Sequence, residues 1–186
     1  MHPHSDNPTF AIVGASESSA CKKPLPSVTP ELVLVSEFVH DYSDVTLLAN
    51  EDATIERTTG ALKSCKWLHL ACHGIPHKSN PFESFFALHD GPLTLKELIL
   101  SDFGNPDFAF LSACRTTVGD ATTPDEVVHL AAAMQFGGFR SVIGTVLPVE
   151  DSVAGQIVSA FYTHLLDGPS AHLNCTKAAV ALHKAL

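Results

Sequence analysis

Short apolar runs alternate along the chain with longer segments in which apolar residues recur at helical spacing. The runs predict strands at residues 10–14, 45–49, 67–72, 85–89, 108–113 and 141–146. The periodic segments predict helices at residues 29–40, 53–63, 94–100, 123–136, 152–166 and 172–186. Such alternation is typical of an α/β fold with a mostly parallel central sheet covered by helices on both faces.

Several helix boundaries carry local signals. Thr29 is expected to cap the first helix, because a proline and an acidic residue follow it. Thr94 and Glu97 have capping-box spacing, as do Thr123 and Glu126. Two later helices are expected to end at Gly137-Gly138 and at Gly168-Pro169. Residues 15–28 and 74–84 are expected to be loops.

Composition excludes several classes of protein. The chain has 186 residues, of which 45% are hydrophobic and 17% charged, so it is long and apolar enough for a folded domain. A net charge of −9 argues against nucleic-acid binding, which needs clustered Lys and Arg. We find no 18-residue apolar run and no export signal, so no membrane association and a cytoplasmic location are expected.

The five cysteines fall at irregular spacings, which favours free thiols in a reducing compartment. Cys65, His69, Cys72 and His73 lack the spacings of zinc sites, and three of them lie on or beside one predicted strand. We therefore expect no metal site and no cofactor.

Two predicted strands end in residues that can carry chemistry. The stretch 66-KWLHLACHG-74 ends on His73 and Gly74, and 107-DFAFLSACRT-116 reaches Cys114 as its strand ends. In open α/β sheets, ligands gather outside the carboxyl ends of the strands. The segment between the two ends is long enough for a hairpin, a helix and a return strand, so thiol and imidazole are expected at one rim.

A histidine beside a cysteine can lower the thiol pKa and make the sulfur a nucleophile. The backbone N–H groups of Gly74 and Cys114 could then hold an oxyanion. A second reading stays open, in which Cys114 is a buried structural thiol and His73 only binds a loop. His69 and Cys72 lie inside their strand and are expected to be packing residues.

Together, the blocks 67–74 and 110–116 resemble the two signature blocks of CHAT domains. These domains belong to the caspase-like cysteine peptidase clan, with separases, gingipains and metacaspases. The Ala-Cys-Arg centre also matches a caspase signature. The resemblance continues through 125–133, 137–145, 149–151 and 161–165 and covers about residues 30–185. It is closest to CHAT domains of mushroom-type fungi, often found at the end of long tetratricopeptide-repeat proteins.

The resemblance implies a caspase-like three-layer αβα sandwich and a cysteine endopeptidase with a regulatory, signalling or defence role. Cys114 would attack the peptide carbonyl, His73 would be general acid and base, and the N–H groups of Gly74 and Cys114 would hold the oxyanion. The substrate would be a protein or peptide bound in extended form. Tetratricopeptide repeats of a longer parent protein are possible partners.

The same resemblance sets expectations for domain boundaries and specificity. Residues 1–28 would be an N-terminal strand and partly flexible loop, and 29–186 a CHAT domain truncated before its closing strand. Leu147 and Pro148 stand where the family usually has tryptophan. Asp151, Glu150 and Asp120 are candidate pocket residues that would favour a basic side chain before the scissile bond. Asp151 is equally explained as a helix cap, and Asp120 as a loop residue.

The sequence leaves one other class of function open and disfavours two. A non-catalytic caspase-like interaction or scaffold module remains the main alternative. A nucleotide-binding domain is disfavoured, because 13-VGAS-16 is a weak glycine loop and no phosphate-binding fingerprint occurs. A serine hydrolase is disfavoured by the absence of a Gly-x-Ser-x-Gly motif.

Overall fold

Five parallel strands form the central sheet of the computed structural model, which describes residues 7–77, 79–112, 125–144, 151–168 and 172–186. At residues 125–129 and 151–152 it describes the backbone alone. The spatial order of the strands is β2-β1-β3-β7-β8. Their bounds are Thr9–Gly14 (β1), Asp44–Ala49 (β2), Trp67–Ala71 (β3), Phe108–Leu111 (β7) and Ser141–Gly144 (β8).

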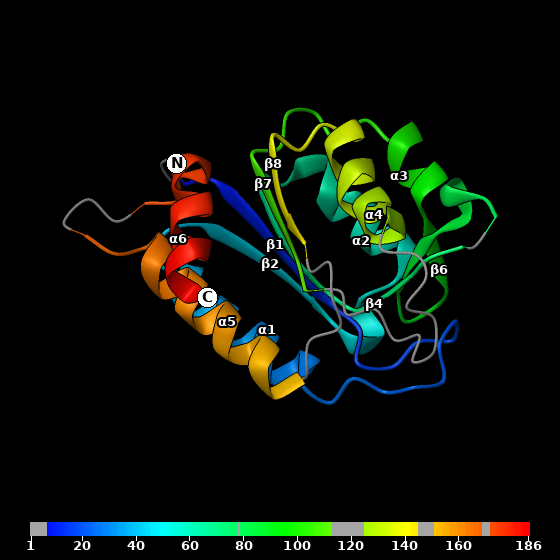
Figure 1. Ribbon diagram of the computed structural model, residues 1–186, viewed down its shortest axis with the longest axis horizontal. Coiled ribbons are helices and arrows are strands. Elements are labelled where there is room, and N and C mark those ends of the chain that lie inside the picture. Colours follow the sequence, from blue (N-terminus) through cyan, green and yellow to red (C-terminus); the bar gives the residue numbers. More distant parts are fainter. Residues whose placement is uncertain (1–6, 78, 113–124, 145–150, 169–171) are drawn as a thin grey trace, which may run out of the picture.

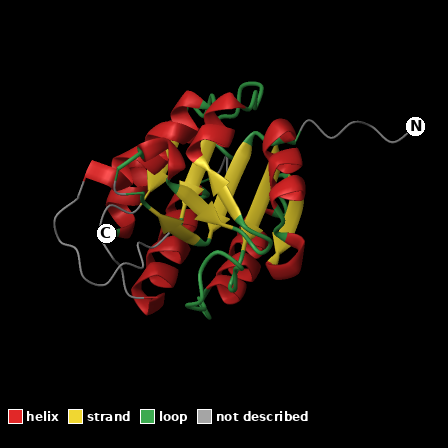
Figure 2. Cartoon of the chain, turned by 90° about the vertical axis from the view of Figure 1, so that its right-hand side faces the viewer, coloured by secondary structure: helices red, strands yellow, loops and turns green. Residues whose placement is uncertain are grey.

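Helices cover both faces of this sheet, as Figures 1 and 2 show. One face carries α1 (Val28–Val39), α5 (Asp151–Leu165) and α6 (Ala178–Ala185). The other carries α2 (Ile55–Ser64), α3 (Leu95–Leu100) and α4 (Asp125–Phe136). The predicted α/β fold, a three-layer αβα sandwich with a parallel sheet, is confirmed.

Alternation along the strands divides the buried residues into two cores. On β1, Phe10 and Ile12 face α1 and α5, whereas Ala11 and Val13 face the opposite layer. Aromatic rings dominate the α1 side, where Trp67 and Phe108 have ring centroids 4.7 Å apart. Burial of each large apolar side chain contributes about 1.5–3 kcal/mol, so both layers stabilise the sheet between them.

A second, antiparallel sheet lies next to the rim of the first. It consists of β4 (His73–Ile75), β5 (Phe85–Ala87) and β6 (Pro92–Thr94). The prediction of a loop over 74–84 is therefore wrong at its start, and the strand expected at 85–89 ends at Ala87. Strands of three residues are too short to show a period of two, which is why the pattern missed β4 and β6.

The helix boundaries agree with the sequence signals in part. Thr94 and Glu97 form the predicted capping box around the start of α3. Thr29 is not the cap of α1, which begins at Val28 after Ser27, and Ser27 makes no side-chain capping bond. The predicted capping residues Thr123 and Glu126 and the Asp151 side chain lie outside the described parts of the chain.

The remaining helical turns are short: η1 (Asn50–Asp52), η2 (Pro81–Glu83) and η3 (Cys175–Lys177). The last of these precedes α6, so the helix predicted from residue 172 begins later than expected. Within the described ranges, no helix has the length and hydropathy needed to cross a membrane.

Candidate active site

The chain turns sharply where β3 leaves the central sheet. β3 ends at Ala71, and after Cys72 the next strand, β4, begins at His73. The neighbouring strand β7 runs parallel to β3, and the Ser112 N–H extends the pairing by donating to the Leu70 carbonyl over 2.9 Å. The predicted adjacency of the two strands is confirmed. Cys114 comes two residues after Ser112 and lies outside the described residues.

The imidazole of His73 is buried and held by the backbone. Its Nε2 lies 2.6 Å from the carbonyl oxygen of Lys23, and the residue is 1% exposed. A carbonyl oxygen only accepts hydrogen bonds, so Nε2 carries the hydrogen. In the neutral ring Nδ1 then bears the lone pair, and among the described residues Nδ1 has no hydrogen-bond partner. The ring is thus fixed as a tautomer with one free proton acceptor.

The loop that supplies the Lys23 carbonyl is itself tied down. Asn50, directly after β2, accepts hydrogen bonds from the backbone N–H of Ser16 at 3.2 Å and from its hydroxyl at 2.6 Å. The Ser19 N–H donates to the His89 carbonyl at 3.0 Å, beyond β5. Asn50 has a φ of 51°, a left-handed conformation that asparagine tolerates better than most residues.

Neither Lys23 nor Asn50 was predicted as part of the site. A hydrogen bond to a backbone carbonyl cannot be predicted from residue types, because every residue has such a carbonyl. The signal available for Asn50 was its position directly after an apolar run, where asparagine often turns the chain.

The other predicted site residues are placed less completely. Gly74 is the buried middle residue of β4 and pairs with Phe86 of β5. Asp120 and Glu150 lie outside the described residues, and Asp151 is the first residue of α5 with only its backbone described. The oxyanion and pocket assignments therefore stay predictions.

Two buried thiols flank β3, Cys65 before it and Cys72 after it, and neither suits nucleophilic chemistry. Cys72 and Cys65 are buried, and burial raises the pKa of each thiol to about 12. Cys72 is fully buried in the core beneath α2, α3 and α4, which confirms its expected packing role. None of the four described cysteines forms a disulfide. Within the described ranges, no three His, Cys, Asp or Glu residues are grouped as metal ligands.

His69 does more than pack. Its Nε2 lies 2.8 Å from Oε1 of Glu31 on α1, and its Nδ1 lies 3.1 Å from the hydroxyl of Tyr162 on α5. All three side chains are buried. Burial and the charge of Glu31 raise the pKa of Tyr162 well above its usual value. This Glu31–His69–Tyr162 triad fastens both helices to β3, and sequence reasoning missed it.

Comparison with known proteins agrees with this architecture. The family model described as CHAT domain matches residues 2–185. A solved structure, the complex of Porphyromonas gingivalis RgpB pro- and mature domains, is similar with a TM-score of 0.56 and 12% identity. The match covers 95% of this chain but 43% of that one. At 12% identity, the similarity shows the fold alone. No match to a curated protein was found. With its caspase-like αβα sandwich, the chain belongs to the CHAT domain family.

Proposed function

We propose that this domain is a cysteine endopeptidase in which His73 and Cys114 cleave peptide bonds. The observation that carries the proposal is the state of His73. Its Nε2–H is fixed on the Lys23 carbonyl, and its Nδ1 is left as a proton acceptor at the carboxyl-end rim of the sheet. Cys114 comes three residues after Leu111, the last residue of the adjoining strand β7.

The proposed reaction uses that lone pair directly. The Cys114 thiol gives its proton to Nδ1 of His73, and the thiolate attacks the peptide carbonyl carbon. Collapse of the tetrahedral intermediate breaks the C–N bond, and the imidazolium protonates the departing amine. Water, losing a proton to the same nitrogen, then hydrolyses the thioester and restores the thiol. The Lys23 carbonyl holds the ring while its charge changes.

The backbone N–H groups of Gly74 and Cys114 would stabilise the developing oxyanion. The substrate would lie extended along the rim, and an acid among Asp120, Glu150 and Asp151 would favour a basic residue before the scissile bond. By family resemblance, the domain would act in cytoplasmic regulation or defence beside tetratricopeptide repeats of a longer parent protein.

The test is covalent labelling of the purified chain. Peptide acyloxymethyl ketones with Arg, Lys, Asp or Leu next to the warhead are incubated with the protein, and the adduct is located by mass spectrometry. We expect the adduct on Cys114, fastest with Arg or Lys, and absent from the His73→Ala variant. Labelling of Cys114 no faster than of Cys21 or Cys175 would contradict the proposal.

One observation favours a second candidate, a non-catalytic interaction module. His73 is 1% exposed, and a working general base must be reachable from the substrate. If the domain is such a module, the labelling experiment fails while the His73→Ala variant loses stability. That combination separates a structural histidine from a catalytic one.

A further inference from the structure

β2 is an edge strand whose outer side is unpaired in the described part of the chain. It pairs with β1 alone, in continuous register from Asp44 to Ala49. Proteins commonly protect such edges with Lys, Pro or a bulge, since the free backbone groups otherwise pair with another chain. β2 has none of these protections.

The backbone groups that face outward can be assigned. The Asp44 N–H donates to the Pro8 carbonyl, so Asp44 bonds inward to β1. Inward and outward residues alternate along a strand paired on one side. Val45 and Leu47 therefore present their N–H and C=O groups at the open edge.

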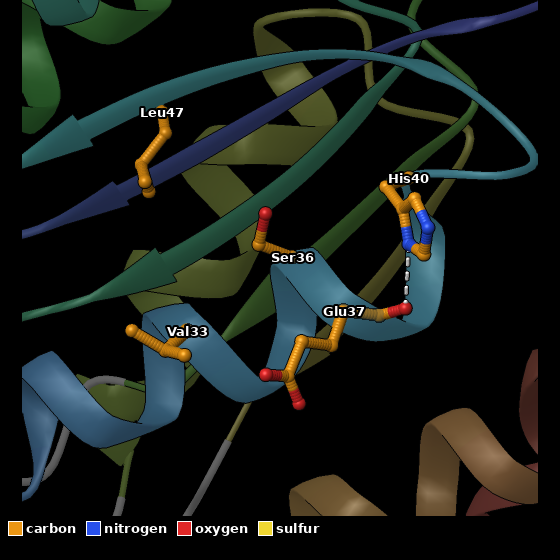
Figure 3. Close-up of a pocket in the computed structure, with 5 residues that line it drawn as sticks. All are labelled: Val33, Ser36, Glu37, His40 and Leu47. Atoms are coloured by element: carbon orange, nitrogen blue, oxygen red, sulfur yellow. Dashed lines mark hydrogen bonds between the residues drawn. The ribbon is translucent and has the colours of Figure 1, made fainter.

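A hollow lies beside this edge, between β2 and the outer side of α1 (Figure 3). Its volume is about 310 Å³, and its lining consists of Val33, Ser36, Glu37, His40 and Leu47. Leu47 and Val33 both line this hollow and are 43% and 52% exposed, so part of its lining is apolar surface open to solvent. A strand added to β2 would place one side chain of its α1-facing row over this hollow.

The segment that contains α1 and β2 is acidic. Residues 24–56 hold seven acidic residues and no Lys or Arg, whereas the rest of the chain has 13 acids and 11 bases. Most of the net charge of −9 thus comes from the segment that contains α1 and β2. Apart from the buried Glu31, these acids are exposed: Glu37, Asp41, Asp44, Glu51, Asp52 and Glu56. Asp52 is paired with Arg57, the first base after the segment.

We infer that β2 is a docking edge for an extended, lysine- or arginine-rich segment of another protein. The segment adds a sixth strand by backbone hydrogen bonds to Val45 and Leu47. One apolar side chain fills the hollow over Leu47 and Val33. Basic side chains two residues before and after it meet the acidic surroundings, with Glu37 nearest the hollow.

Charge also argues against a second copy of this chain as the occupant. Pairing of β2 with β2 across a two-fold axis would bring both acid-rich segments together, and like charges at an interface disfavour association. The docking edge is separated from His73 by β1 and β3, so the inference does not depend on the proposed peptidase activity.

The experiment is an NMR titration of the ¹⁵N-labelled chain with the peptide Lys-Thr-Lys-Thr-Leu-Thr-Lys-Thr-Lys. We expect amide shifts confined to β2, α1 and their flanks. Two further peptides carry N-methyl groups on the odd or on the even residues. Both have the charge of the parent, but N-methylation removes the N–H groups that face β2 in only one of them. The peptide without the N–H groups that face β2 is expected to bind at least tenfold more weakly than the parent. The other peptide is expected to bind with an affinity within threefold of the parent.

Protein variants complete the test. Leu47→Lys is expected to weaken binding at least tenfold, and Glu37→Lys at least fivefold. The matched controls Leu100→Lys, at an exposed leucine of α3, and Glu17→Lys, at an exposed acid outside the segment, are expected to change nothing. Shifts elsewhere, equal binding of both methylated peptides, or no binding overturns the inference. So does a dimer that forms without peptide and dissociates in Leu47→Lys.

Discussion

The imidazole Nε2 of His73 and the backbone carbonyl of Lys23 lie 2.6 Å apart, although one residue begins β4 and the other belongs to the loop before α1. This bond decides which ring nitrogen keeps its lone pair. Because the acceptor is a backbone atom, the precision of the site depends on how firmly that loop is held.

Asn50 is the residue that tests this dependence. Asn50→Ala removes the acceptor for both Ser16 hydrogen bonds. It also places alanine at a φ of 51°, a left-handed conformation that alanine tolerates less well than asparagine. We expect a loss of about 1–3 kcal/mol in the free energy of unfolding by urea. Labelling of Cys114 should slow as well. Asn50→Asp keeps the acceptor and is expected to recover most of both losses; equal losses in the two variants would contradict the role of the loop.

The Glu31–His69–Tyr162 triad predicts a specific cost. Tyr162→Phe keeps the ring but leaves Nδ1 of His69 buried without its partner, which should lower the free energy of unfolding by about 1–3 kcal/mol. The control is Tyr42→Phe at the only other tyrosine, which is half-buried and outside the triad. Urea denaturation measures both, and an equal effect of the two substitutions would contradict the account.

Two glycines should respond in opposite directions to alanine. A Cβ on Gly14 would come within 2.8 Å of Leu32 and of Val28, so Gly14→Ala should destabilise by about 1–3 kcal/mol. Gly60 is exposed inside α2 with nothing within 4 Å, so Gly60→Ala should stabilise by about 0.5–1 kcal/mol. Thermal unfolding checks the signs; a stabilised Gly14→Ala would mean that α1 lies farther from β1.

The buried thiols predict a fall of stability at alkaline pH. Each pKa is raised from 9.0 to about 12, so the native state keeps a proton that the unfolded state releases between those values. This stability is complete below pH 9 and is lost as pH rises, by up to about 1.4 kcal/mol per pH unit for each thiol. Urea unfolding from pH 8 to 11 should show a shallower fall of stability for Cys72→Ala than for wild type. Identical slopes for wild type and Cys72→Ala would show that Cys72 is accessible.

The main sheet could be predicted because its strands are short, mostly apolar runs with helix signals between them. The rim position of His73 followed from the same pattern. In the small sheet, β5 was predicted from its apolar run, but β4 and β6 could not be, since Gly74 and Pro92 are poor strand residues in segments of only three. The triad joins residues 38 and 93 positions apart, and Glu31 alone was explained as an early helix acid. Such partners are brought together by packing, which no local pattern encodes.

The central claim is that His73 activates Cys114. Its most direct test is the pH dependence of Cys114 alkylation by iodoacetamide, followed by mass spectrometry, in wild type, His73→Ala and the control His77→Ala. We predict that Cys114 reacts at least tenfold faster than Cys175 at pH 7, with an inflection below the usual thiol pKa of about 8.5. His73→Ala should abolish the advantage, and His77→Ala should keep it. If Cys114 follows Cys175 across the pH range and His73→Ala changes nothing, the two residues are not a catalytic pair.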